Sequence, residues 1–136
     1  EALIRRGLDM ENAELTERLD RFHALIAEDR AVEAVQLLRE VLPRHDHYPD
    51  LHFLLGAAEL QVGHVDDAIA SLARALELNP EFHAARIRFA MALNAAGMRA
   101  AAFDQITLVQ QCEPDNEEAQ AFLRAHGGRG QGVARP

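Results

Sequence analysis

The feature that most constrains this chain of 136 residues is an internal repeat with a period of about 34 residues. Ala34, Ala68 and Ala102 are equally spaced at this period. The same offset aligns other apolar, glycine and proline positions, namely Val41 with Ala75 and Val109, Leu38 with Leu72 and Ile106, Gly63 with Gly97, and Pro80 with Pro114. A fixed period of this length is typical of supersecondary units that stack side by side.

Each period contains two apolar stripes at helical spacing, which predicts a pair of helices. In the middle period these stripes are Leu51, Leu54, Leu55 and Ala58, followed by Ala68, Ile69, Leu72, Ala75 and Leu76.

The breaks between these helices have their own signals. Gly63 and Gly97 are expected to adopt the positive φ that ends one helix, and Pro80 and Pro114 predict new helices near residues 81 and 116. Where helices cross, only small side chains let the backbones approach closely, which we expect at Gly56, Ala68, Ala75, Ala90 and Ala102.

The middle period resembles the tetratricopeptide repeat, whose signature is W-x2-L-G-x2-Y, then A-x3-F, then P. It supplies Leu55-Gly56 for the L-G pair, Ala68 and Leu72 for A-x3-F, and Pro80 at the end. His52 and Glu59 replace the aromatic residues of the signature. The next period also matches, with Arg86 in place of the Trp and the remaining slots filled by Phe89-Ala90, Leu93, Ala102, Ile106 and Pro114.

The first period departs most from this signature. Arg21-Phe22 takes the place of the L-G pair, Asp29 that of the turn glycine, and Asp46 that of the terminal proline. A second helix from Ala31 to Leu42 is well marked, whereas a shift of one residue in the first helix stays open.

The resemblance implies an all-α fold, a right-handed superhelical solenoid of antiparallel helix pairs. The expected domain, 1–126, consists of the end of a partial preceding repeat (1–14), three repeats (15–48, 49–82 and 83–116) and a capping helix (117–126). A flexible Gly-rich tail (127–136) is expected to follow.

In this family the first helix of each repeat lines a concave groove, so the resemblance implies a protein or peptide partner there. Phe53, Ile87 and Met91 are the favoured contacts, to be tested by their joint replacement with alanine. Arg88 is the one plausible cation, which disfavours a clamp for C-terminal carboxylates. The implied groove residues are Asp50, Phe53, Leu54, Ala57, Leu60, Gln61, Ala84, Ile87, Arg88, Met91, Asn94 and Ala95.

Composition narrows the partners. A formal net charge of −8 disfavours nucleic acid, and no apolar run is long enough to insert into a membrane. All 14 basic residues are Arg, a bias typical of GC-rich bacterial genomes. The single cysteine, Cys112, is expected to be a small buried hydrophobe or a free thiol, and it favours a reducing compartment such as the cytoplasm without fixing the location.

The sequence contains no recognisable catalytic constellation, so we expect no enzyme activity and no cofactor. His45-Asp46-His47 with Asp50 and His52 could ligate a metal, but a polar connection between repeats explains them better. We therefore expect a protein-interaction scaffold or adaptor. The alternatives are an accessory region of a larger bacterial glycosyltransferase or sulfotransferase, or a secretion chaperone, and self-association through the repeat ends stays open.

Overall fold

Residues 2–127, which the computed structural model describes, form helices joined by short turns. Side chains are described from residue 12 onward, and the predicted tail lies outside the described residues apart from Gly127. No strand occurs within residues 2–127. The helices are α1 (Ala2–Ala27), α2 (Ala31–Val41), α3 (Pro49–Gln61), α4 (Val65–Leu78), α5 (His83–Ala95), α6 (Arg99–Cys112) and α7 (Glu117–Phe122), with a 3-10 turn over Leu42–Arg44 and a π-helical turn over Leu123–Gly127.

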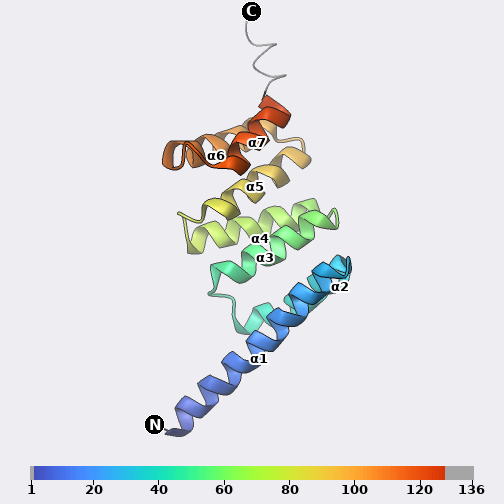
Figure 1. Cartoon of the computed structure of the whole chain (residues 1–136), viewed down its shortest axis with the longest axis vertical. Helices are drawn as coiled ribbons and strands as arrows, with labels where there is room; N and C mark the ends of the chain where they lie inside the picture. Colours follow the sequence, from blue (N-terminus) through green and yellow to red (C-terminus); the bar gives the residue numbers. More distant parts are fainter. Residues whose placement is uncertain (1, 128–136) are drawn as a thin grey trace, which may run out of the picture.

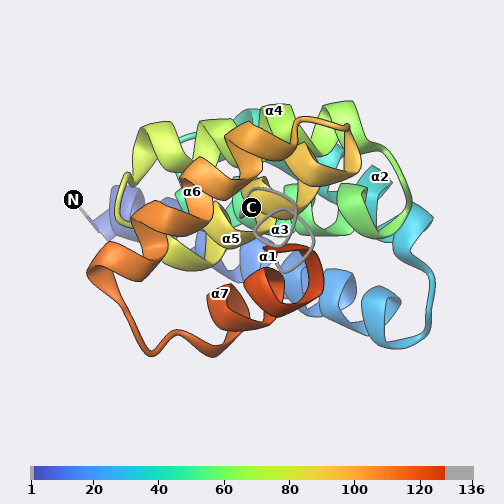
Figure 2. The ribbon, with the colours of Figure 1, turned by 90° about the horizontal axis from the view of Figure 1, so that it is seen from above.

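The helices stack as antiparallel pairs, α1 with α2, α3 with α4, and α5 with α6, and α7 closes one end (Figure 1). Seen along the stack, α2, α4 and α6 lie toward one side and α1, α3, α5 and α7 toward the other (Figure 2). This arrangement confirms the all-α solenoid of helix pairs predicted from the repeat period.

The repeated apolar positions form the core of the stack. Leu38, Leu72 and Ile106, which lie one period apart, are among the largest fully buried side chains. The small residues predicted at helix crossings are buried as well: Gly56, Ala68, Ala75, Ala90 and Ala102. A short side chain at each crossing lets two helix backbones approach, and a large side chain fills the space between them. Both kinds of core position therefore recur with the period.

The turns inside the three helix pairs share one backbone conformation. Gly63 has φ 87° and Gly97 has φ 86°, which confirms the predicted left-handed geometry. Asp29 lies one period before Gly63 and also has a positive φ, 61°. The first pair therefore keeps the register of the other two, without the shift of one residue that the sequence left open.

Replacing Asp29 with glycine is expected to stabilise the chain by about 0.5 to 1 kcal/mol, because an L-residue with a side chain is strained at positive φ. Chemical denaturation monitored by circular dichroism measures this gain. The matched control is Gly63→Asp, which places a side chain at a positive φ in the next helix pair and should lower stability. An unchanged or lower stability for Asp29→Gly would show that the turn carries no strain.

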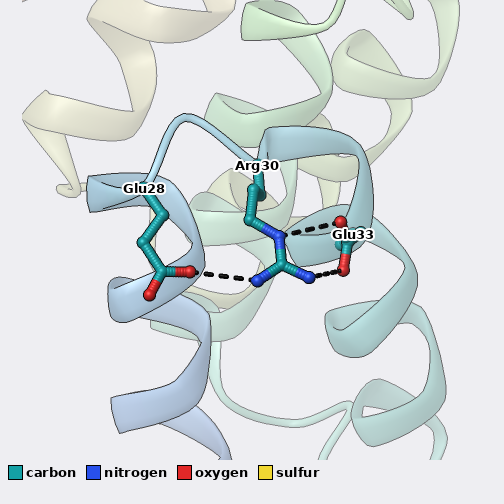
Figure 3. Close-up of polar contacts among 3 residues, drawn as sticks. All are labelled: Glu28, Arg30 and Glu33. Carbon is teal, nitrogen blue, oxygen red and sulfur yellow. Dashed lines mark hydrogen bonds and ion pairs between the residues drawn. The ribbon is translucent and has the colours of Figure 1, made fainter.

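An ion-pair cluster braces the turn between α1 and α2 (Figure 3). Arg30 Nη1 lies 3.1 Å from Glu28 Oε2, and Arg30 Nη2 lies 2.5 Å from Glu33 Oε2. The hydrogen bond from Arg30 holds the pKa of Glu33 below its ordinary value of 4.5. This contribution to stability is therefore present at neutral pH and is lost as the pH falls through the pKa of Glu33 in the folded chain. The cluster is exposed, so its effect is small.

Helix α1 spans one expected boundary. It runs without a break from Ala2 to Ala27, so the expected division between residues 14 and 15 lies inside a helix. The segment from Asn12 to Leu19 is made of helix-compatible residues with neither proline nor glycine, which explains the continuity. The N-terminal half of α1 projects beyond α2 (Figure 1).

Candidate functional site

The outward residues of α1, α3, α5 and α7 repeat with the same period as the core. On α3 these residues follow helical spacing from Asp50 to Gln61, and equivalent positions on the other helices are exposed or half-buried. We call this surface the odd-helix face; it comprises Thr16, Asp20, His23, Ala27, Asp50, Leu54, Ala57, Gln61, Ala84, Arg88, Met91, Ala95 and Glu118.

Eight of the predicted groove residues belong to the odd-helix face. Five of these side chains are exposed, whereas Leu54, Ala57 and Arg88 are half-buried, and Leu54 also packs against the core cluster around Leu38. Met91 is the most exposed large apolar residue among the eight, at 39%. The eight are Asp50, Leu54, Ala57, Gln61, Ala84, Arg88, Met91 and Ala95.

Ile87 is a correction to the predicted set. Its side chain is 2% exposed and belongs to the core cluster that contains Leu93 of α5, Ile106 of α6 and Phe122 of α7. Helix α5 therefore turns this position inward, under the closing helix. Replacing Ile87 with alanine would test core packing and not partner binding, so the triple alanine variant expected from the sequence is unsuitable.

Three further predicted residues are held by neighbours within the chain. The ring of Phe53 packs against that of Phe82, with centroids 4.9 Å apart, and Leu60 packs against the core cluster around Leu72. Asn94 Nδ2 lies 3.5 Å from His126 Nδ1 in the turn after α7. These contacts leave the three side chains half-buried, and we do not count them in the odd-helix face.

Sequence reasoning missed the members of the face that lie on α1 and α7. Thr16 and Asp20 are exposed at the positions that lie one period before Asp50 and Leu54. His23 and Ala27 repeat the same relation to Ala57 and Gln61, and Glu118 lies one period after Ala84. The signal was the period itself, which the departures in the first repeat obscured.

An ion pair crosses the face. Arg88 Nη1 lies 3.0 Å from Glu118 Oε2, which joins α5 to α7, and the same nitrogen lies 3.5 Å from the sulfur of Met91. The predicted cation is thus neutralised by an acidic residue of the closing helix.

Polar residues replace the signature aromatic residues behind the face. Glu59 is 2% exposed, and its carboxylate accepts hydrogen bonds from Arg39 Nη2 at 2.8 Å and from Ser71 Oγ at 2.6 Å. The hydrogen bond to Glu59 raises the pKa of Arg39, which also reaches Asp67 at 3.1 Å. This network joins α2, α3 and α4, so it fixes the first helix pair against the second.

The histidine-rich connection before α3 is built as a structural segment. His52 is buried, and its Nε2 lies 2.7 Å from the backbone oxygen of Asp46. The ring of His47 packs on that of Tyr48, with centroids 4.2 Å apart. Within the part of the chain that the structure describes, no group of three His, Cys, Asp or Glu residues is placed to hold a metal ion.

Two other expectations concern accessibility. Cys112 is an exposed free thiol at the end of α6, so of the two predicted roles the buried one is wrong. Among the described residues, no helix is both long enough and apolar enough to cross a bilayer.

Comparison with known proteins agrees with this geometry. Residues 25–74 match the family model described as a tetratricopeptide repeat. No curated protein matches the chain. Among solved structures, the second tetratricopeptide domain of human RPAP3, in complex with an HSP70 peptide, superimposes with a TM-score of 0.78 at 18% identity over 85% of this chain and 96% of that one.

Two further structures have the same fold. MamA gives a TM-score of 0.77 at 18% identity and covers 93% of this chain and 74% of its own. The Yersinia enterocolitica type III secretion chaperone SycD, in complex with a peptide of the translocator YopD, gives 0.73 at 16% identity, over 83% of this chain and 86% of its own. Together with the helix pairs and their regular period, these matches show that residues 25–74 match the tetratricopeptide repeat and that the chain has the fold of tetratricopeptide domains.

Proposed function

We propose that this chain is a protein-interaction scaffold or adaptor, and that the odd-helix face binds a peptide segment of its partner. The observation that carries the proposal is the exposure of Met91, one period after Ala57, on a face that also carries half-buried Leu54. Apolar side chains left accessible on a regular helical surface suit a partner that buries its own apolar anchors there.

The neighbours in fold space support this use. RPAP3 and SycD were each solved with a bound peptide, and both share the stacked helix pairs of this chain. The tetratricopeptide fold is generally a non-catalytic interaction module. Ser71 is the only serine in the sequence, and its hydroxyl donates a hydrogen bond to the buried carboxylate of Glu59. This contact favours a structural role for Ser71 over a role as a catalytic nucleophile.

The proposal also includes the bounds of the repeats and the kind of partner that the chain does not bind. We assign the repeats to residues 15–48, 49–82 and 83–116, with α7 and the following turn as the cap that covers the last apolar face. The net charge of −8 argues against nucleic acid as the partner, because phosphate would be repelled.

Charge placed on the odd-helix face is expected to abolish peptide binding. We would select peptides from a random display library on the wild-type chain and measure the affinity of the best one by fluorescence anisotropy. Met91→Glu and Leu54→Glu should each weaken binding by about 10-fold or more, because each buries a carboxylate against an apolar anchor.

The matched control is Leu108→Glu, which changes an exposed leucine (44%) on α6, outside the odd-helix face. It should alter the affinity by less than about 2-fold. Circular dichroism establishes that all three variants fold. Equal effects of the three substitutions, or peptides that bind all variants alike, would contradict the proposed face.

A further inference from the structure

The charges on the odd-helix face point to the kind of peptide that it takes, provided that the proposed function is right. Three acidic residues lie on the face, Asp20 on α1, Asp50 on α3 and Glu118 on α7. Arg88 is its single arginine, and His23 is its single histidine. At neutral pH the face is therefore net negative.

Arg88 is already used within the chain. Its ion pair with Glu118, at 3.0 Å, joins α5 to α7, and both side chains remain partly exposed, at 35% and 57%. A carboxylate arriving from a partner would have to displace Glu118 to reach this guanidinium.

The nearby arginines do not supply a substitute. Arg18 and Arg21 of α1 line a hollow together with Leu37 of α2, on the side of α1 that faces its helix partner. Arg86 donates to Gln105 Oε1 at 2.6 Å and to the backbone oxygen of Pro80 at 2.9 Å.

The two aspartates of the odd-helix face, unlike Arg88, form no ion pair among the described residues. Among the described residues, neither Asp20 nor Asp50 has an ion-pair partner within 4.0 Å, and both are exposed. They lie on the first helices of consecutive repeats: Asp20 lies one period before Leu54, and Asp50 lies one period after Thr16. An extended peptide that crosses α1 and α3 would therefore pass both carboxylates.

We propose that the odd-helix face selects peptides that carry Lys or Arg beside apolar anchors, and that Glu118 sets this preference by occupying Arg88. The aliphatic stems of Lys and Arg can cover Leu54 and Ala57 while their charged ends reach Asp20 and Asp50. Acidic segments meet two unpaired carboxylates and no available cation on this face.

The test repeats the library selection at about pH 7.5 on four forms of the chain. These are the wild type, the double variant Asp20→Asn/Asp50→Asn, Glu118→Gln, and the control Glu77→Gln. The control removes an acidic residue from a more exposed ion pair, that of Glu77 with Arg74 on α4, at 3.1 Å. The readout is the frequency of charged residues in selected peptides relative to the unselected library.

We expect Lys and Arg to be enriched about 2-fold or more on the wild type and on Glu77→Gln. The double variant should lose this enrichment, and Glu118→Gln should raise the recovery of Asp and Glu because Arg88 becomes available. Best peptides from the wild type should also lose about 5-fold or more in affinity at high salt.

Other outcomes would overturn the inference in distinguishable ways. Neutral or acidic peptides that still depend on Leu54 and Met91 would refute the charge preference and leave the proposed function standing. A basic preference that survives Asp20→Asn/Asp50→Asn, or one that Glu118→Gln leaves unchanged, would refute the residues assigned here. Peptides that ignore Leu54→Glu would refute the binding face and, with it, this inference.

Discussion

Replacing Arg39 with alanine is expected to lower the free energy of unfolding by about 2 to 3 kcal/mol. The loss arises because the carboxyl group of Glu59, which is 2% exposed, loses the guanidinium that pairs with it. Ser71 then supplies the remaining hydrogen bond to that carboxylate. The estimate lies below the range for a fully buried pair because Arg39 is 43% exposed and water can reach its site.

A double-mutant cycle isolates this interaction. In the Glu59→Gln background, the Arg39→Ala substitution should cost less than about 1 kcal/mol, since no buried charge is left behind. The surface control is Arg74→Ala, which breaks the exposed pair with Glu77 and should cost less than about 0.5 kcal/mol. Urea denaturation measures all four variants. Equal costs for Arg39→Ala with and without the Glu59 carboxylate would show that the two residues are not coupled.

Replacing Gly56 with alanine is expected to destabilise the chain by about 2 kcal/mol, although alanine favours a helix over glycine by about 1 kcal/mol. A Cβ at this position would lie 2.6 Å from Leu72 Cγ and 3.0 Å from Leu72 Cδ2. Leu72 is fully buried and has no room to move away, so α3 and α4 would be forced apart. The change in denaturation midpoint gives the effect directly.

Two comparisons separate the steric cause from backbone strain. Gly63→Ala meets no atom within 4 Å and should cost only the strain of its φ of 87°, about 1 kcal/mol. Leu72→Ala alone leaves a cavity and should cost about 3 kcal/mol. The double variant Gly56→Ala/Leu72→Ala should lose less stability than the sum of the two single variants, because the new Cβ then meets no Leu72 side chain. A neutral or stabilising Gly56→Ala would mean that the helices can separate without loss.

Much of the fold could be predicted from the sequence because the period repeats core positions. Each repeat buries the same positions between its helices, so the side chains there stay apolar and similar in size, as at Ala34, Ala68 and Ala102. The turns were predictable for a local reason, since a positive φ at Gly63 and Gly97 needs no distant contact. Asp29 shows that the register can hold even where the residue type departs.

The candidate site was less predictable because its decisive contacts join distant residues. Ile87 follows the spacing of an outward residue, but its place in a cluster with Phe122 depends on how the closing helix sits over α5. The ion pair of Arg88 with Glu118 also joins α5 to α7, and nothing in the sequence around either residue predicts this partner. The buried Glu59 is comparable, since its partner Arg39 lies on a different helix, α2.

The central claim is that peptides bind across the odd-helix face, and the most direct test locates a bound peptide on the folded chain. Backbone amide resonances can be followed by NMR while a selected peptide is added to the isotope-labelled protein. We expect the largest shifts at residues of α1, α3 and α5 around Asp20, Leu54 and Met91, with little change on α2, α4 and α6. Shifts centred on Leu108 and the even-numbered helices would contradict the account.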